Sequence, residues 1–139
     1  ANVLALEKTL ELALTNQEAR YNYLKELGDM IKSHLSEYKN VSINSRENSL
    51  PSIINFSLVG EKALTILDKF EEHNIILSAK TSCCPITTPS KLVYALTKDK
   101  QKASSSIRVS LSYKTTKEEV EEFLKVFDLI YKEIYHGEV

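Results

Sequence analysis

Two neighbouring cysteines are the residues of this chain with the clearest potential for chemistry. Cys83 and Cys84 are its only cysteines, and Pro85 and Pro89 follow them closely. Adjacent cysteines can bond to each other only with strain, so we expect free thiols and a reducing compartment, the cytoplasm. A thiolate on a loop can act as a nucleophile. A loop thiol without any role fits the same residues, so the cysteines alone leave both interpretations open.

Other kinds of site find less support in the sequence. The histidines His34, His73 and His136 have no zinc-like spacing to the cysteine pair, so no metal site is predicted. The formal net charge of -1 gives no electrostatic reason to expect nucleic acid or an anionic membrane surface. No apolar run approaches the roughly 20 residues that span a bilayer. We therefore expect neither a nucleic-acid partner nor a membrane partner.

The elements on either side of the cysteines are predicted to hold this loop in place. Residues 75–77 form an apolar run typical of a buried strand. Residues 89–96 predict a short helix with Pro89 in its first turn and Thr88 as its N-cap. The loop would therefore run from a strand into a helix.

The C-terminal third predicts a strand and a long helix after a polar linker. The linker covers residues 97–104, and residues 106–112 alternate with period two, which places Arg108 opposite the apolar face. Thr116 and Glu119 have the spacing of a capping box, and a strong apolar stripe follows them. Gly137 predicts the C-terminal end of this helix.

The N-terminal half predicts the remaining elements. Residues 3–14 are apolar on most faces and predict a well-buried helix, and a capping-box spacing at 15–18 predicts a restart or kink there. A second helix covers residues 20–38, and its Gly28 suggests close packing.

Two further strands and an amphipathic helix are predicted between residues 41 and 73. The strands cover residues 41–44 and 53–58, and the helix that follows them ends at His73. The predicted fold is α+β: a mainly antiparallel sheet of about four short strands with about five helices packed on it. A chain of 139 residues is long enough for one domain with its own core.

Several segments resemble one family. Residues 77–83, Leu-Ser-Ala-Lys-Thr-Ser-Cys, resemble the active-cysteine loop of cysteine desulfurases, which are pyridoxal-phosphate enzymes of the class V aminotransferase group. Residues 50–57, 106–111 and 113–120 resemble other passages of the same family, in the same order. The resemblance covers residues 1–139 but matches only the C-terminal small domain of these fold type I enzymes. It implies a single domain here, with the large cofactor-binding domain absent.

The resemblance also implies roles for individual residues. Cys83 would be the thiolate that takes sulfur from L-cysteine as a persulfide and leaves L-alanine. Arg108 would hold the substrate carboxylate. Two further residues depart from the family pattern: Lys80 stands where a small residue is frequent, and Cys84 where serine or threonine is usual. Lys80 is close to Cys83 in the sequence and could raise its thiolate fraction, and Cys84 could compete with Cys83 or receive its sulfur.

The resemblance further implies cofactors and partners. Pyridoxal phosphate would be bound by the parent protein and by no residue of this segment, so the segment alone is expected to be inactive. A sulfur-acceptor protein and a homodimer are implied for the parent, in iron–sulfur cluster assembly or in thio-cofactor and tRNA synthesis. Two alternatives stay open: another class V aminotransferase or lyase that does not use the cysteine, and a non-catalytic domain that docks a partner through the cysteine loop.

Overall fold

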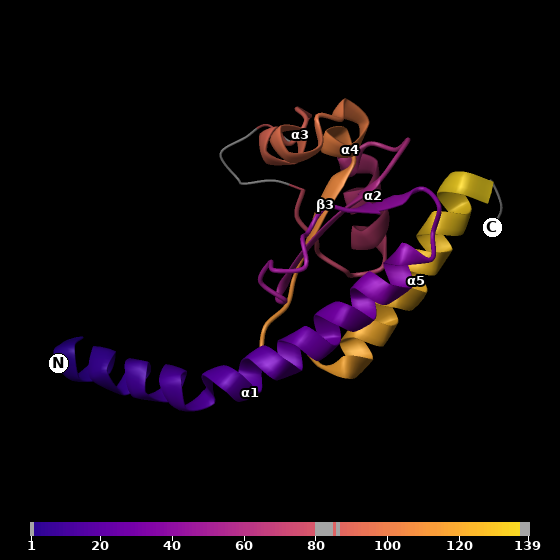
Figure 1. Cartoon of the computed structure of the whole chain (residues 1–139). Coiled ribbons are helices and arrows are strands. Elements are labelled where there is room, and N and C mark those ends of the chain that lie inside the picture. The colour runs from indigo at the N-terminus through magenta and orange to yellow at the C-terminus, as the bar shows by residue number, and fades with distance from the viewer. Residues whose placement is uncertain (1, 80–84, 86, 137–139) are drawn as a thin grey trace.

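The computed structural model of the chain describes residues 2–79, 85 and 87–136. Its elements, in chain order, are α1 (Asn2–Ser36), β1 (Val41–Ile43), β2 (Ile53–Leu58), α2 (Ala63–Glu72), α3 (Lys91–Thr97), α4 (Lys100–Ser104), β3 (Ser106–Ser110) and α5 (Lys117–His136). Figure 1 shows a body built around the strands, from which the first half of α1 projects.

The three strands form one antiparallel sheet in the order β1-β2-β3, which confirms the predicted α+β class. The predicted strand at 75–77 is wrong. Within the described part of the chain, residues 75–77 have no strand pairing, and the next residue, Ser78, forms an isolated antiparallel bridge to Arg108. The backbone groups of Arg108 are thereby paired with Ser78, on the side of β3 that faces away from β2.

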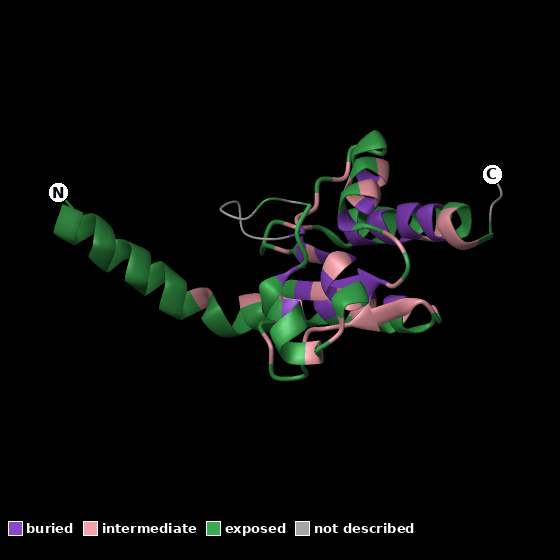
Figure 2. Ribbon diagram, turned by 90° about the horizontal axis from the view of Figure 1, so that it is seen from above, coloured by how far each residue is buried: buried purple, intermediate pink, exposed green. Residues whose placement is uncertain are grey.

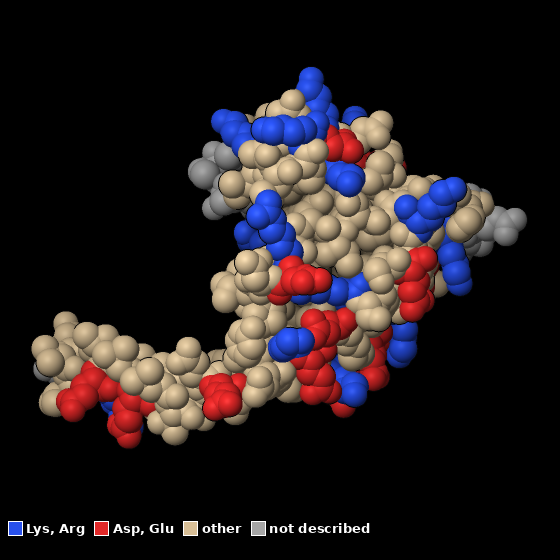
Figure 3. Space-filling model, viewed as in Figure 1, with Lys and Arg blue, Asp and Glu red and all other residues tan. Residues whose placement is uncertain are grey.

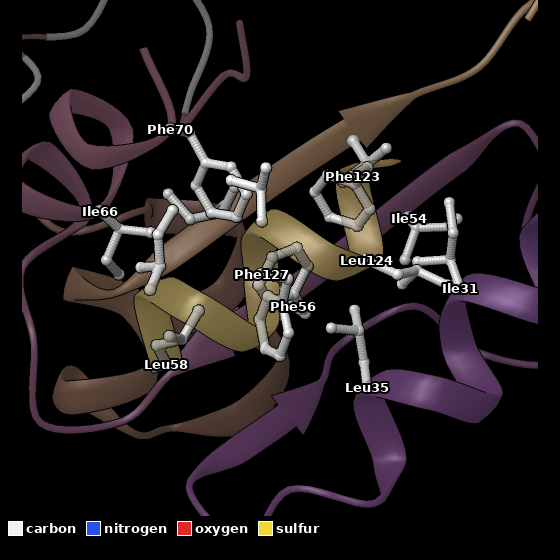
Figure 4. Packing of buried hydrophobic residues seen from close by; sticks show 14 of the residues in the cluster. Ile31, Leu35, Ile54, Phe56, Leu58, Ile66, Phe70, Phe123, Leu124 and Phe127 are labelled. Atoms are coloured by element: carbon white, nitrogen blue, oxygen red, sulfur yellow. The ribbon is translucent and has the colours of Figure 1, made fainter. Parts of the chain in front are cut away.

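The core lies on one face of the sheet, beneath the second half of α1 together with α2 and α5. Figure 4 shows Phe56 and Ile54 of β2 directed toward Phe127 and Leu124 of α5. These positions follow from the period-two alternation of β2, whose Ile54, Phe56 and Leu58 are fully buried. Phe127 is also fully buried, and its ring packs edge-on against Phe56 with ring centres 5.9 Å apart.

Gly28 allows α1 to approach the loop before β2. A Cβ atom added at Gly28 would lie 2.5 Å from the carbonyl oxygen of Pro51, closer than real Cβ atoms come to such a neighbour. The predicted close packing at this glycine is confirmed.

The other face of the sheet is covered by α3 and α4, where two predictions need correction. The N-cap of α3 is Ser90, whose hydroxyl accepts from the backbone N–H of Val93, and Thr88 lies outside the helix. The predicted linker at 97–104 instead contains α4, because Asp99 caps two backbone N–H groups in the same way.

The first half of α1 is also different from the prediction. Residues 2–18, here called the arm, are helical but leave the body, and Figure 2 shows nearly all of them exposed. The predicted burial of residues 3–14 is therefore wrong: Val3 is 78% exposed and Leu14 is 71% exposed. The predicted break at 15–18 is also wrong, because α1 is continuous and the hydroxyl of Thr15 donates to the carbonyl of Glu11 within the helix.

The helix α5 begins as predicted. The hydroxyl of Thr116 accepts from the backbone N–H of Glu119, and the carboxylate of Glu119 accepts from the backbone N–H of Thr116, which is a complete capping box. The predicted stop at Gly137 lies outside the described residues. None of the described helices combines the length and apolar character that crossing a membrane requires.

Candidate functional site

The face of the sheet opposite the core carries a row of polar side chains that the strand register brings together. Asn55 of β2 is paired with Arg108 of β3, and the backbone N–H of Asn44 donates to the carbonyl of Asn55 at 2.8 Å on the other side of β2. Since the backbone of Arg108 is bonded to Ser78, Asn55 and Arg108 form a non-hydrogen-bonded pair, in which side chains lie closer together. The row Asn44–Asn55–Arg108 thus crosses the sheet.

A network of hydrogen bonds connects the two asparagines of this row to neighbouring serines and to α4. The amide nitrogen of Asn44 donates to Oδ1 of Asn55 at 2.7 Å and to Oγ of Ser57 at 2.8 Å. The hydroxyl of Ser57 donates in turn to the carbonyl of Lys102 in α4 at 2.8 Å. Asn55 also bonds Ser106 of β3, with its amide nitrogen 3.0 Å from the hydroxyl.

A pocket of about 420 Å³ lies between this row and α3. Its sheet side is formed by Asn44, Asn55 and Arg108, its helix side includes Ser90, Val93 and Leu96, and its loop side includes Ala79, Thr88 and Pro89. Among the described residues that line it, Arg108 and Lys91 are cationic and none is a carboxylate. The described lining therefore favours an anionic ligand.

The guanidinium of Arg108 has a donor that no described residue satisfies. Its Nε atom is buried and has no hydrogen-bond partner, and Oδ1 of Asn44 is a buried acceptor in the same condition. An unsatisfied buried polar atom lowers the free energy of unfolding by about 1–3 kcal/mol. An unpaired donor in a pocket wall therefore indicates a role in binding and not in stabilising the fold. The predicted orientation of Arg108, opposite the apolar face, is confirmed. Its role in binding a carboxylate stays a prediction.

The predicted nucleophile and its accessory residues lie outside the described part of the chain. Cys83, Cys84 and Lys80 belong to the segment 80–84. Of the residues on either side of this segment, Ala79 and Thr88 both line the Arg108 pocket. Residues on both sides of this segment in the sequence therefore line the pocket that contains the predicted substrate-binding residue.

The sequence reasoning missed Asn44 and Asn55 as pocket residues. Both could have been found from the pattern that assigned the core face of β2, because alternation places Asn55 opposite Ile54 and Phe56. Asn44 needed the register of β1 against β2, which sequence alternation alone does not supply.

Solved structures share this architecture. A NifS-like protein from Rickettsia africae superposes with a TM-score of 0.74 at 29% identity, covering 87% of this chain and 31% of that protein. A second structure, also described as a NifS-like protein, gives a TM-score of 0.73 at 21% identity, which shows the fold alone.

Curated proteins match along nearly the whole chain. The cysteine desulfurase IscS of Clostridium botulinum is 28% identical over 138 residues, which is 96% of this chain and 35% of that protein. The NifS/IcsS protein homolog of Lactobacillus delbrueckii subsp. bulgaricus is 28% identical over 136 residues, 95% of this chain and 35% of its own length. The chain thus spans about a third of the length of these relatives.

The family itself is shown by a match over most of the chain. Residues 1–123 match the family described as Aminotransferase class-V, and this range includes the whole sheet, the pocket and the start of α5. The chain belongs to the class V aminotransferase family.

Proposed function

We propose that this chain is the C-terminal small domain of a pyridoxal-phosphate-dependent cysteine desulfurase, in which Arg108 binds the carboxylate of L-cysteine and Cys83 accepts its sulfur. The observation that carries the proposal is the buried, unpaired Nε of Arg108 in a pocket lined by both flanks of the cysteine loop. The similarity to cysteine desulfurases over nearly the whole chain supports the choice of substrate.

Arg108 suits the task of binding a carboxylate. A guanidinium presents its donors in one plane and can hold both oxygens of a carboxylate through charge-assisted hydrogen bonds. The described lining of the pocket contains no carboxylate that would occupy these donors beforehand. A substrate anion would therefore find the guanidinium available, on the strand β3, where the backbone of Arg108 is held by its hydrogen bonds to Ser78.

Cys83 is close to this pocket along the chain. It is four residues from Ala79 and five from Thr88, both of which line the pocket. Four residues of extended chain reach about 14 Å at most, so the thiol can be delivered to a substrate held by Arg108. The same tether can then present the sulfur to an acceptor protein.

The sulfur transfer balances without a further reactant. The Cys83 thiolate attacks the sulfur of L-cysteine, a sulfur–sulfur bond forms, and the carbon–sulfur bond of the substrate breaks. The electron pair of that bond stays with the substrate carbon, which takes up the substrate's thiol proton to give L-alanine. The enzyme is left with a persulfide on Cys83.

We infer that pyridoxal phosphate is held by groups outside the described residues of this pocket. The pyridine nitrogen of this cofactor is commonly paired with an acidic group, and no described residue lining the pocket is acidic. This chain corresponds to about a third of the length of its relatives, and we assign the cofactor's binding groups to the part of the parent protein that corresponds to the remainder. When bound there, the cofactor supplies the electron withdrawal that weakens the substrate's carbon–sulfur bond.

The arm supports a parent protein larger than this chain. Its exposed large apolar residues are Val3, Leu4, Leu6, Leu10, Leu12 and Leu14. In Figure 3 its acidic side chains follow one edge, and the surface that faces the body is uncharged. Such a helix gains most of its stability from packing, so we infer that the cofactor-bearing domain covers this surface.

The test is steady-state kinetics on the full-length protein that carries this chain, with L-alanine formed from L-cysteine as the readout. Replacing Arg108 by alanine should raise KM for L-cysteine roughly 100-fold, because a charged, two-point contact is lost. Arg46→Ala is the matched control, since Arg46 is exposed and outside the pocket. The 139-residue chain alone should form no L-alanine.

Two results would contradict the proposal. An unchanged KM in Arg108→Ala would mean that the domain binds something other than the substrate carboxylate and would favour a non-catalytic interaction domain. Turnover of other amino acids, with full activity in Cys83→Ser, would indicate a class V aminotransferase or lyase that does not use the thiol.

A further inference from the structure

Two complementary polar atoms in the pocket wall lack partners. Nε of Arg108 is a buried donor and Oδ1 of Asn44 is a buried acceptor, and within the described chain these are the buried side-chain polar atoms left without a hydrogen bond. Both residues line the same pocket. Each atom is the kind of partner that the other needs.

The amide of Asn44 can take only one orientation. The hydroxyl of Ser57 donates its proton to the carbonyl of Lys102, so it can only accept from Asn44. Oδ1 of Asn55 is also an acceptor, and it lies 2.7 Å from the same amide nitrogen. A flipped amide would place the oxygen of Asn44 against that acceptor. The network therefore directs Nδ2 of Asn44 toward Asn55 and Ser57, and Oδ1 of Asn44 is left to accept from a different donor.

The register places Asn44 within reach of Arg108. Asn44 neighbours Asn55 on one side of β2, and Arg108 is paired with Asn55 on the other. Two strand spacings separate the backbones of Asn44 and Arg108 by about 10 Å, and an arginine side chain that lies across Asn55 can bridge that distance. Because the Asn55–Arg108 pair is of the non-hydrogen-bonded type, the arginine side chain starts close to Asn55.

We propose that Asn44 is a positioning residue for Arg108: when a carboxylate enters the pocket, Nε–H of Arg108 donates to Oδ1 of Asn44. This bond holds one edge of the planar guanidinium and leaves the two Nη groups to bind the carboxylate. Asn44 therefore acts on the ligand through the arginine, by fixing its plane. The inference rests on the proposed function in one respect, that Arg108 is the carboxylate-binding group.

Nuclear magnetic resonance of the 139-residue chain tests the bond directly, with propionate as the probe. In the unchanged protein, propionate should shift the Nε–H resonance of Arg108 and the side-chain amide of Asn44 together, and slow exchange of the Nε proton with water. In Asn44→Ala the Nε proton should keep its fast exchange at saturating propionate. Asn22→Ala, on an exposed asparagine of α1, should behave as the unchanged protein. An Nε proton that becomes protected equally in Asn44→Ala would overturn the proposal, and so would the absence of any shift.

Kinetics of the full-length protein separate positioning from a purely structural role. Asn44→Ala should raise KM for L-cysteine roughly tenfold while kcat stays within about twofold, because an interaction of the bound carboxylate is weakened. In an Arg108→Ala background the same change should have no further effect on KM.

The outcomes of this cycle are distinct. Additive effects of the two substitutions, or an unchanged KM in Asn44→Ala, would overturn the positioning role while leaving Arg108 as the carboxylate ligand. An unchanged KM in Arg108→Ala would instead contradict the proposed function itself.

Discussion

Replacing Arg108 by methionine should stabilise the fold while it removes the anion site. Methionine keeps an unbranched chain of similar reach but has no buried donor at the position of Nε, which is unpaired in the structure. Removing that unpaired donor is worth about 1–3 kcal/mol, and repacking an unbranched apolar side chain costs less than about 1.5 kcal/mol. The expected net gain in the free energy of unfolding is about 1 kcal/mol, which corresponds to about 3 °C in Tm for a domain of this size.

The assay is thermal and urea unfolding of the 139-residue chain, with propionate titrations on the same samples. Arg46→Met is the matched control, because Arg46 is exposed and its replacement should change stability by less than about 0.5 kcal/mol. The reasoning is refuted if Arg108→Met lowers the free energy of unfolding by about 1 kcal/mol or more, since the guanidinium would then have a structural partner. Stability gained together with unchanged propionate binding would also refute it.

Three further predictions concern the scaffold. Gly28→Ala should destabilise the fold by about 2 kcal/mol in urea unfolding, because the clash of the new Cβ with the carbonyl of Pro51 outweighs about 1 kcal/mol of helix preference; a stabilised variant would show that the loop yields. Phe127→Ala should cost about 3–5 kcal/mol, since Phe127 is fully buried, whereas Leu129→Ala, at a site 55% exposed, should cost less than about 0.5 kcal/mol. Desolvation raises the pKa of Tyr135 from 10.0 to about 12, so the folded state keeps this proton longer than the unfolded chain. The stability that this confers is present below pH 10 and is lost as the pH rises to about 12; Tyr135→Phe should flatten that decline in pH-dependent unfolding, and an identical slope would contradict the assignment.

Alternation and capping signals predicted much of the scaffold because they are local. The strand at 53–58 was predicted with its bounds and with its buried face, and the capping box at Thr116 was predicted with both of its partners. Each of these depends on residues within one turn or one strand. The chain order of the other strands and the amphipathic helices followed from the same periodicities.

The errors occurred where another part of the molecule decides the outcome. The leucines of the arm have the composition of a buried helix, but no described element covers them. Residues 75–77 have the composition of a strand, but the chain pairs with β3 at a single bridge. Asp99 supplied a cap that turned a polar linker into α4. Hydrophobic content predicted burial or pairing in the first two cases without identifying a partner.

In the candidate site, too, local patterns predicted the orientation of a residue but not its neighbours. That Arg108 lies on the polar face of its strand followed from alternation, whereas its contact set depends on pairing between strands far apart in the sequence. Asn44 is 64 positions from Arg108, and only the register of three strands puts both in one row. The unpaired state of Nε and Oδ1 is a property of the packed side chains, which periodicity cannot predict.

The most direct test of the proposed chemistry is the location of the sulfur after one turnover. Full-length protein is mixed with L-cysteine, quenched with a thiol-alkylating reagent, digested and analysed by mass spectrometry of the peptide that contains residues 80–91. The account predicts one extra sulfur atom on Cys83 and none on Cys84, with an equal amount of L-alanine released. It also predicts that Cys84→Ser retains the modification and that Cys83→Ser loses it. An extra sulfur found first on Cys84, or L-alanine formed without any persulfide on this peptide, would contradict the account.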